Sequence, residues 1–158
     1  MVTGESEPLT RPLEERRYHA HRWVPEQKEK TMLGKADAVP MIAVTDLDRA
    51  RRFYEDKLGL ETKDEWGGEG ATLKSGDTLI NVYRSRFAGT NQATALTFDV
   101  DDVEKEVGEL KEKGIFFEKY DLPGLEPQGD FYVGEKGFKT AWFKDPDGNI
   151  LSLVEGGE

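Results

Sequence analysis

The sequence predicts an α+β fold built from two copies of one strand–helix–strand unit. The segment Ile42–Leu47 (IAVTDL) is echoed by Phe98–Val103 (FDVDDV), which begins 56 residues later. Each copy continues through a helical pattern to a glycine, Gly59 or Gly114, and then into residues typical of strands. The second copy ends with a predicted strand, a tight turn at Asp145–Gly148 and a further strand. A repeat of this period indicates two supersecondary units, neither of which buries its apolar face alone.

The first unit is expected to contain a strand, a helix and three further strands. Apolar residues predict a strand over Val39–Val44. Leu47, Ala50, Tyr54 and Leu58 recur at intervals of three and four, which predicts a helix over 47–58. Asp46 is its expected N-cap and Gly59 its expected stop. The remaining strands are expected over Leu60–Glu65, Ala71–Lys74 and Thr78–Tyr83, with a turn at Ser75-Gly76-Asp77 between the last two.

The second unit repeats this order. A strand is predicted over Ala95–Val100, and a helix over Val103–Lys113 with Asp102 as its N-cap. Its remaining strands are expected over Ile115–Tyr120, Lys139–Phe143 and Ile150–Val154. The stretch from Asp121 to Gly137 contains glycine and proline and is predicted to be a long loop, a kind of segment that is more often functional or mobile than incidental.

These segments resemble the two βαβββ modules and the terminal DPDGN turn of the vicinal oxygen chelate superfamily, which includes glyoxalase I, extradiol dioxygenases and bleomycin-resistance proteins. The resemblance implies curved mixed sheets around a cavity, with both helices outside. It places module one at residues 36–86 and module two at 93–156, within a single glyoxalase-like domain at 34–158. Residues 1–33 then form an N-terminal extension, either an arm that packs on a partner or a mobile tail. Such folds host many activities, so the resemblance indicates fold more than chemistry.

Composition excludes several classes of partner and site. The chain carries a net charge of −10, all of it on residues 35–158, and such an acidic surface repels phosphate backbones, so we expect no nucleic-acid partner. There is no apolar run of about 18 residues, so we expect no membrane span. The absence of cysteine excludes disulfides, thiolate nucleophiles and zinc–sulfur sites. With no apparent signal peptide, a cytoplasmic location is expected.

The resemblance also implies where a metal would bind. Metal-dependent members of the superfamily carry ligands on cavity-facing strand positions, which correspond here to Val39, Asn81, Ala95 and Ser152. Valine and alanine offer no lone pair, while serine and a neutral amide are poor ligands for divalent transition metals. A catalytic site needs about three protein ligands, so we expect no metal and no other cofactor. The only histidines, His19 and His21, lie in the extension, where a surface or packing role is favoured over chelation.

Strand alternation predicts which side chains face the cavity. Asp99 is a weak catalytic candidate because a carboxylate in an apolar cavity has a raised pKa; the favoured alternative is a solvated residue at the rim. The polar members of the set either bind a ligand or satisfy one another, and the strand aromatics either stack on a ligand or belong to the core. Arg84 and Arg86 either meet an anion or pair with nearby acids. The predicted ligand-binding residues are Asn81, Tyr83, Thr97, Asp99, Trp142 and Ser152, with Phe131 and Tyr132 as a candidate lid.

The leading hypothesis is a metal-independent, small-molecule-binding homodimer of the resistance or sequestration type. The first alternative is a lyase, isomerase or dioxygenase of the same superfamily with displaced ligands such as Asp99 and Glu155. The second is a partner-binding protein that uses its N-terminal arm. No GxSxG, Walker or dinucleotide motif occurs, and the body of the chain lacks histidine and cysteine, so the common nucleophile–base pairs are excluded.

Overall fold

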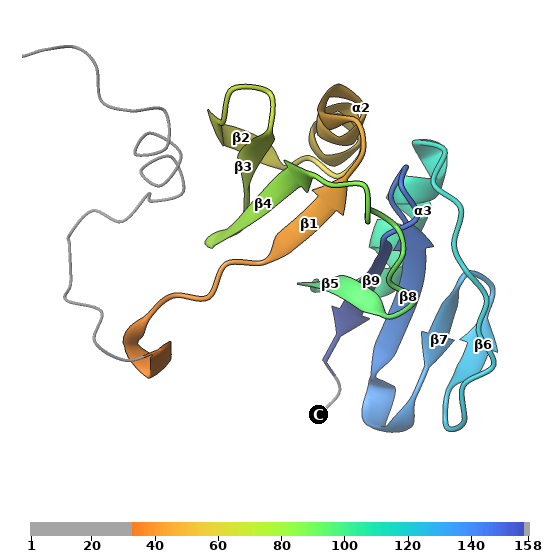
Figure 1. The fold of residues 1–158 in the computed structure, drawn as a ribbon. Coiled ribbons are helices and arrows are strands. Elements are labelled where there is room, and N and C mark those ends of the chain that lie inside the picture. The colour runs from red at the N-terminus through yellow and green to blue at the C-terminus, as the bar shows by residue number, and fades with distance from the viewer. Residues whose placement is uncertain (1–32, 157–158) are drawn as a thin grey trace, which may run out of the picture.

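The computed structural model describes residues 33–156 and places them in two mixed sheets, each with its own helix (Figure 1). In each sheet, the strand that comes first in the sequence pairs in parallel with the strand that comes last, and the remaining pairs are antiparallel. Sheet A has the order β1 (Met41–Val44), β4 (Thr78–Arg84), β3 (Gly70–Ser75), β2 (Glu61–Glu65). Sheet B has the order β5 (Thr94–Asp99), β9 (Ile150–Glu155), β8 (Lys139–Lys144), β7 (Phe131–Val133), β6 (Glu126–Gln128). The predicted α+β fold is confirmed.

Short segments complete the described chain. A 3₁₀ turn, η1, spans Leu33–Lys35, and a second, η3, spans Glu135–Gly137. Among residues 33–156, no helix is long and apolar enough to cross a membrane. Apart from Leu33, the predicted N-terminal extension lies outside the described residues, as do both histidines.

The helix of the first unit begins where the sequence predicts but changes form midway. In α2 (Leu47–Arg52), the carboxylate of Asp46 accepts a hydrogen bond from the Arg49 N–H at 3.0 Å, which lowers the pKa of Asp46. The chain then widens into the π-helical turn η2 (Phe53–Lys57), so the single predicted helix is in two parts. Within the π-helical turn, Phe53 and Tyr54 are both buried and meet edge to face.

The helix of the second unit, α3 (Val103–Glu112), agrees closely with its prediction. Asp102 caps it through the Lys105 N–H at 3.0 Å, and the buried residues Val103, Val107 and Leu110 form its apolar stripe. The Glu155 carboxylate at the end of β9 accepts a second hydrogen bond at this helix start, from the Val103 N–H at 2.9 Å. The last strand therefore fixes the start of α3.

Two predictions for the region after α3 are wrong. The predicted strand Ile115–Tyr120 is reduced to one antiparallel bridge between Phe117 and Phe143. The first part of β8 pairs instead with β7, at Lys139 and Thr140. The predicted long loop at 121–137 contains the β6–β7 hairpin, whose turn is Gly129-Asp130 with Gly129 at φ +63°. A Gly-Asp pair between short strand-forming runs is a hairpin signal that the glycine and proline content obscured.

A buried polar turn joins the two units. Asp145, which is 5% exposed, accepts four hydrogen bonds through its carboxylate: from the backbone N–H groups of Asp147 and Asn149, from the Asn149 amide at 2.8 Å, and from the Tyr54 hydroxyl at 2.9 Å. The Asn149 amide also donates to the Ala43 carbonyl oxygen at 2.8 Å. Tyr54 and Ala43 belong to the first unit, so the terminal turn of the second unit is anchored in the first.

Apolar packing continues across the same junction. One hydrophobic core contains residues from the helix-facing sides of both sheets and from both helices. Burial, and then the charge of Asp145, raise the pKa of the Tyr54 hydroxyl far above its ordinary value, so Tyr54 remains a donor. Because a buried polar group is costly unless it is paired, this network also selects one arrangement of the two units.

The segment between the sheets is held by a close backbone approach. Gly89 donates its N–H to the Asn149 side-chain oxygen at 3.3 Å and adopts φ +70°. A Cβ at this position would lie 1.8 Å from the Asp147 carbonyl oxygen, so only glycine allows the linker to lie against the turn.

We expect Tyr54→Phe to reduce the free energy of unfolding by about 1–3 kcal/mol, because it leaves the buried Asp145 carboxylate without one donor. The matched control is Tyr120→Phe: among the described residues nothing hydrogen-bonds to the buried Tyr120 hydroxyl, so its removal should be neutral or slightly stabilising. Urea denaturation of both variants measures the difference. Equal losses in the two would contradict the role assigned to Tyr54.

Gly89→Ala should destabilise the protein more than Gly124→Ala does. Both glycines have a positive φ, but the space around a Cβ at Gly124 is open. Backbone strain of about 1–2 kcal/mol is common to both variants, and overpacking against the turn adds about 1–3 kcal/mol for Gly89 alone. Thermal and urea unfolding should rank them in that order, and the reverse order would show that the linker does not depend on this contact.

Candidate functional site

The face of sheet B that points away from α3, here called the open face, brings together several of the predicted ligand-binding residues. Trp142 lies at its centre on β8, opposite Ser152 on β9, and Ser152 lies opposite Thr97 on β5. The hydroxyl oxygens of Thr97 and Ser152 are 2.7 Å apart and share a hydrogen bond. Side chains at paired strand positions share one face, so alternation correctly grouped these three.

Three aromatic rings form a cluster on this open face. Trp142 makes edge-to-face contacts with Tyr120 and with Tyr132, with ring centroids 5.6 Å apart in each pair. The Tyr132 hydroxyl accepts a hydrogen bond from the Tyr120 backbone N–H at 2.7 Å, and the Trp142 indole N–H donates to the Thr94 hydroxyl at 3.3 Å. The cluster is therefore held by directional contacts, and the Trp142 ring is half-buried rather than part of the core.

The Tyr120 hydroxyl is a polar atom for which the structure supplies no partner. It is buried, and nothing in the described part of the chain hydrogen-bonds to it. Burial, and then the charge of Glu118, raise the pKa of Tyr120, so the phenol stays neutral and keeps a proton to donate. A buried donor without a partner costs about 1–3 kcal/mol, which an acceptor on a bound molecule would offset.

Asn81 and Tyr83 lie on the other sheet. Asn81 is 3% exposed; its amide oxygen accepts from the Thr72 hydroxyl at 2.9 Å, and its amide nitrogen lies 3.5 Å from the Met41 sulfur. Tyr83 is half-buried on the same strand. No contact recorded for residues 33–156 joins these side chains to the Trp142 cluster. That all six strand residues line a single concavity therefore stays a prediction.

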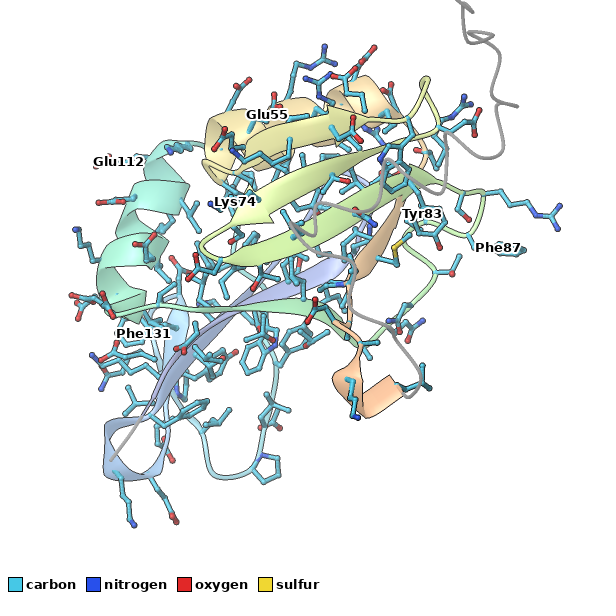
Figure 2. The ribbon with its side chains drawn as sticks, turned by 90° about the vertical axis from the view of Figure 1, so that its left-hand side faces the viewer. Glu55, Lys74, Tyr83, Phe87, Glu112 and Phe131 are labelled. Atoms are coloured by element: carbon cyan, nitrogen blue, oxygen red, sulfur yellow. The ribbon has the colours of Figure 1, made fainter. Side chains whose placement is uncertain are left out.

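Phe131 does not lie where the sequence analysis placed it. It is 8% exposed and belongs to the hydrophobic core, whereas the next residue, Tyr132, points to the open face. In Figure 2, Phe131 and Tyr83 lie at opposite sides of the molecule. Because the segment is a paired strand of sheet B rather than a free loop, its two aromatics alternate between faces and do not form a lid together.

Two further placements differ from strict alternation. A bulge between Thr94 and Leu96 shifts the register of β5, so Thr94 meets Trp142 while Ala95 packs against the core. Val39 precedes β1 and is 39% exposed. Asp99 is exposed at the end of β5, as expected for a residue at the rim.

The residues that the resemblance places at the metal-ligand positions do not have the chemistry of a metal site. The four corresponding positions hold Val39, Asn81, Ala95 and Ser152, and the two polar ones already bond to neighbouring side chains. Within residues 33–156, no three His, Cys, Asp or Glu side chains are grouped to hold a metal ion. Glu155, suggested as a displaced ligand, accepts a hydrogen bond from the start of α3 and pairs with Lys139. It shares its face of β9 with Leu151 and Leu153, and Ser152 lies on the opposite face.

Sequence reasoning missed Thr94 and Tyr120. A β-bulge has no clear signature in a single sequence. The contact between Thr94 and Trp142, which depends on the bulge, could therefore not be predicted. Tyr120 is the last residue of a predicted strand. Alternation along that strand puts Tyr120 and Glu118 on the same face. The ion pair between Glu118 and Lys144 agrees with this placement.

Comparison with known proteins agrees with this architecture. The family model described as the Glyoxalase/Bleomycin resistance protein/Dioxygenase superfamily matches residues 38–153. No curated protein matches the sequence significantly.

Solved structures share the fold at low identity. Lactoylglutathione lyase from Agrobacterium tumefaciens is 20% identical, with a TM-score of 0.60 over 77% of this chain and 94% of that chain. A fosfomycin resistance protein from Listeria monocytogenes is 13% identical, with a TM-score of 0.60 over 77% and 93%. An antibiotic-binding protein from a Streptomyces species is 18% identical, with a TM-score of 0.53 over 78% and 98%. With the family model matching most of its length, the chain belongs to the glyoxalase/bleomycin resistance protein/dioxygenase superfamily.

Proposed function

We propose that this protein binds a planar small organic molecule on the open face of sheet B, and that it does so without a metal ion. The observation that carries the proposal is the Trp142 cluster. It combines an aromatic surface with a neutral, unpaired phenol donor at Tyr120 and the hydroxyl pair of Thr97 and Ser152. Small-molecule sites commonly combine apolar and aromatic walls with a few polar groups that fix orientation.

The chemistry of this face favours binding over turnover. The polar groups around Trp142 are hydroxyls and an indole N–H, which are not general bases at neutral pH, and the nearby Glu118 carboxylate is paired with Lys144 at 3.5 Å. Asp99, the one carboxylate expected there, is exposed. A molecule with a conjugated ring and a carbonyl-type acceptor matches the aromatic surface and the Tyr120 donor.

The comparisons support a binding role without defining the ligand. One solved structure of the same fold is an antibiotic-binding protein and another is a fosfomycin resistance protein. The proposal therefore keeps the resistance or sequestration role expected from the sequence. We also propose, as expected from the sequence, that the protein is cytoplasmic and has no nucleic-acid partner.

The homodimer remains part of the proposal. Each sheet ends in a strand with an unpaired edge among the described residues: β1 pairs only with β4, and β5 only with β9. Met41, on β1, is 51% exposed. An open edge with exposed apolar side chains favours pairing with a second copy, which would also extend the surface available to a ligand.

A thermal-shift screen of planar antibiotics and aromatic metabolites, run with EDTA, should yield compounds that raise the unfolding temperature, since a ligand that binds the native state stabilises it. For such a compound, Trp142→Leu should raise the Kd by more than about tenfold, equivalent to about 1.4 kcal/mol, because the stacking surface is lost. Isothermal titration calorimetry measures the change.

Two other variants calibrate this result. Phe116→Leu removes a ring that is 87% exposed and should leave the Kd unchanged. Asp99→Asn should keep it within about tenfold, as expected for one neutralised contact at the rim. Unaltered affinity in Trp142→Leu would refute the site, and metal-dependent turnover that collapses in Asp99→Asn would favour the enzyme alternative.

A further inference from the structure

The two sheets differ at the edge that each presents beyond its first strand. β1 and β5 are the matching first strands of the two units, and each pairs in parallel with one neighbour, β4 or β9. Along such a strand, alternate residues direct their backbone N–H and carbonyl groups to the neighbour, and the residues between them direct theirs to the free side. The free-side groups that are still unbonded therefore decide where another strand can add.

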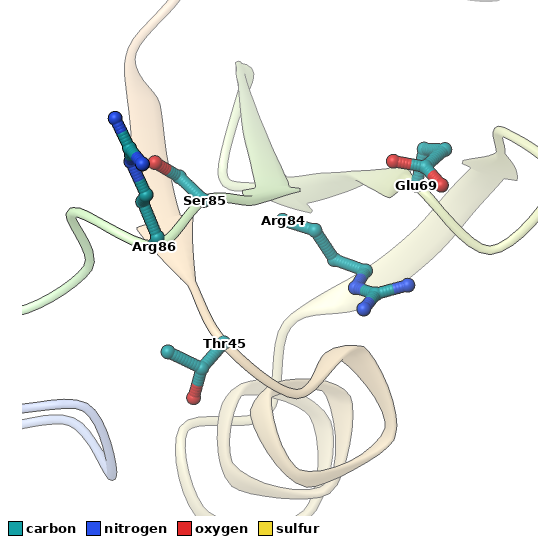
Figure 3. Close-up of a pocket in the computed structure, with 5 residues that line it drawn as sticks. All are labelled: Thr45, Glu69, Arg84, Ser85 and Arg86. Carbon is teal, nitrogen blue, oxygen red and sulfur yellow. The ribbon is translucent and has the colours of Figure 1, made fainter.

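The free side of β1 is largely occupied by the turn of the second unit. The Val44 carbonyl oxygen accepts a hydrogen bond from the segment that follows β4, so its neighbours Ala43 and Thr45 direct their backbone groups outward. The Ala43 carbonyl oxygen accepts from the Asn149 amide at 2.8 Å. The N–H of Thr45, which lies where β1 ends (Figure 3), donates to the Asp147 carboxylate at 3.2 Å. This edge is capped from within the chain.

The free side of β5 is open. The Val100 N–H donates to the Val154 carbonyl oxygen at 2.9 Å, so by alternation Val100 and Phe98 face β9, while Thr97 and Asp99 direct their backbone groups to the free side. Within residues 33–156, no hydrogen bond reaches these outward backbone groups. Both residues are exposed. Sheet B therefore offers a template for another strand where sheet A does not.

The strands at the far ends of the two sheets are protected against pairing. β2 exposes Glu61, Lys63 and Glu65 and contains a bulge. β6 is three residues long, and its middle residue is Pro127, which has no N–H. Charges, bulges and proline are the features that keep edge strands from adding to another sheet. β5 lacks this protection over Leu96–Phe98, beyond the bulge at its start.

The charge distribution favours contact at the same place. The net charge of −10 lies on residues 35–158, so two copies of this chain repel each other over most of their surface. The segment Phe87–Phe98, which leads into β5 and includes most of it, contains no charged side chain, and within residues 33–156 every other uncharged segment is shorter. A contact centred on β5 therefore meets the least like-charge repulsion.

We propose that β5 pairs with β5 of a second copy, antiparallel about a two-fold axis between the two Thr97 residues. The inference rests on the homodimer of the proposed function and assigns its interface. Both backbone groups of Thr97 face the free side, so the two copies can exchange N–H···O=C hydrogen bonds there. In this register Leu96 lies opposite the partner's Phe98, an apolar pair, and Asp99 lies opposite the partner's Ala95, so the two aspartates do not face each other.

This pairing gives the partner a part in the ligand site. Side chains at paired positions share one face, with their Cβ atoms about 5 Å apart, so the two Thr97 hydroxyls lie side by side on the open face. The row of Trp142, Ser152 and Thr97 across sheet B continues into the partner's Thr97. The partner's strand lies about 14 Å from the strand of Trp142, at three strand spacings. A ligand that extends from Trp142 along this row reaches the partner's hydroxyl.

Disulfide trapping tests the register, because the chain has no cysteine and each substitution supplies a single thiol. In full-length protein under mild oxidation, Thr97→Cys should cross-link more than half of the chains, since directly paired residues have Cα atoms within disulfide range. Asp99→Cys is the matched control. It is exposed on the same strand and face, but in this register it lies about 13 Å along the strand from its copy, so it should not cross-link.

Sedimentation velocity of the unligated protein tests the edge itself. Thr97→Pro removes the outward N–H and leaves the bonds to β9 in place, so it should shift the dimer to monomer, whereas Thr97→Val keeps that N–H and should remain dimeric. Circular dichroism checks that each variant is folded, and the cross-linking test does not depend on the proline variant. Trp142→Leu, which tests the ligand site, should remain dimeric, so failure of the ligand site and failure of the interface are separate results.

Three results would overturn the proposal. A monomeric wild-type protein would refute the homodimer and its interface together. A folded Thr97→Pro protein that stays dimeric, or Asp99→Cys that cross-links as well as Thr97→Cys, would refute the β5 pairing and leave the homodimer standing. Cross-linking in a mixture of Met41→Cys and Thr97→Cys, without cross-linking of Thr97→Cys alone, would assign the contact to β1 and β5.

Discussion

The arrangement of the two units depends on one buried carboxylate. Asp145 accepts hydrogen bonds from its own turn, from Asn149 and from Tyr54 of the other unit, and Asn149 extends the network to the Ala43 carbonyl oxygen. A buried charge is expensive unless it is fully paired, so the turn is stable only when both units are in place. Apolar packing brings the units together over a broad area, whereas this network defines their relative position.

The functional surfaces follow from that arrangement. The helix-facing sides of both sheets pack into the shared core. The opposite face of sheet B carries Trp142, its two tyrosine neighbours and the Thr97–Ser152 pair. The same junction thus leaves an aromatic, neutral surface on sheet B.

Much of the fold could be predicted because its signals are local or repeated. The caps at Asp46 and Asp102, the apolar stripe of α3 and the strand alternation that grouped Thr97, Trp142 and Ser152 all depend on near neighbours in sequence. The failures involve pairing choices between distant strands. The predicted strand at 115–120 is reduced to one bridge to β8, the bulge at Ala95 moves Thr94 into the site, and the hairpin sends Phe131 into the core. The partnerless Tyr120 hydroxyl is a property of three-dimensional packing and has no signature in the sequence.

We propose that the open face of sheet B binds its ligand without a metal ion. The most direct test is calorimetric titration of a compound that binds, performed on protein dialysed against EDTA and again after addition of zinc, manganese or nickel. We expect the same Kd, within about twofold, in every sample, because hydroxyls and aromatic rings make all the contacts. Binding that disappears after chelation and returns with one metal would contradict it.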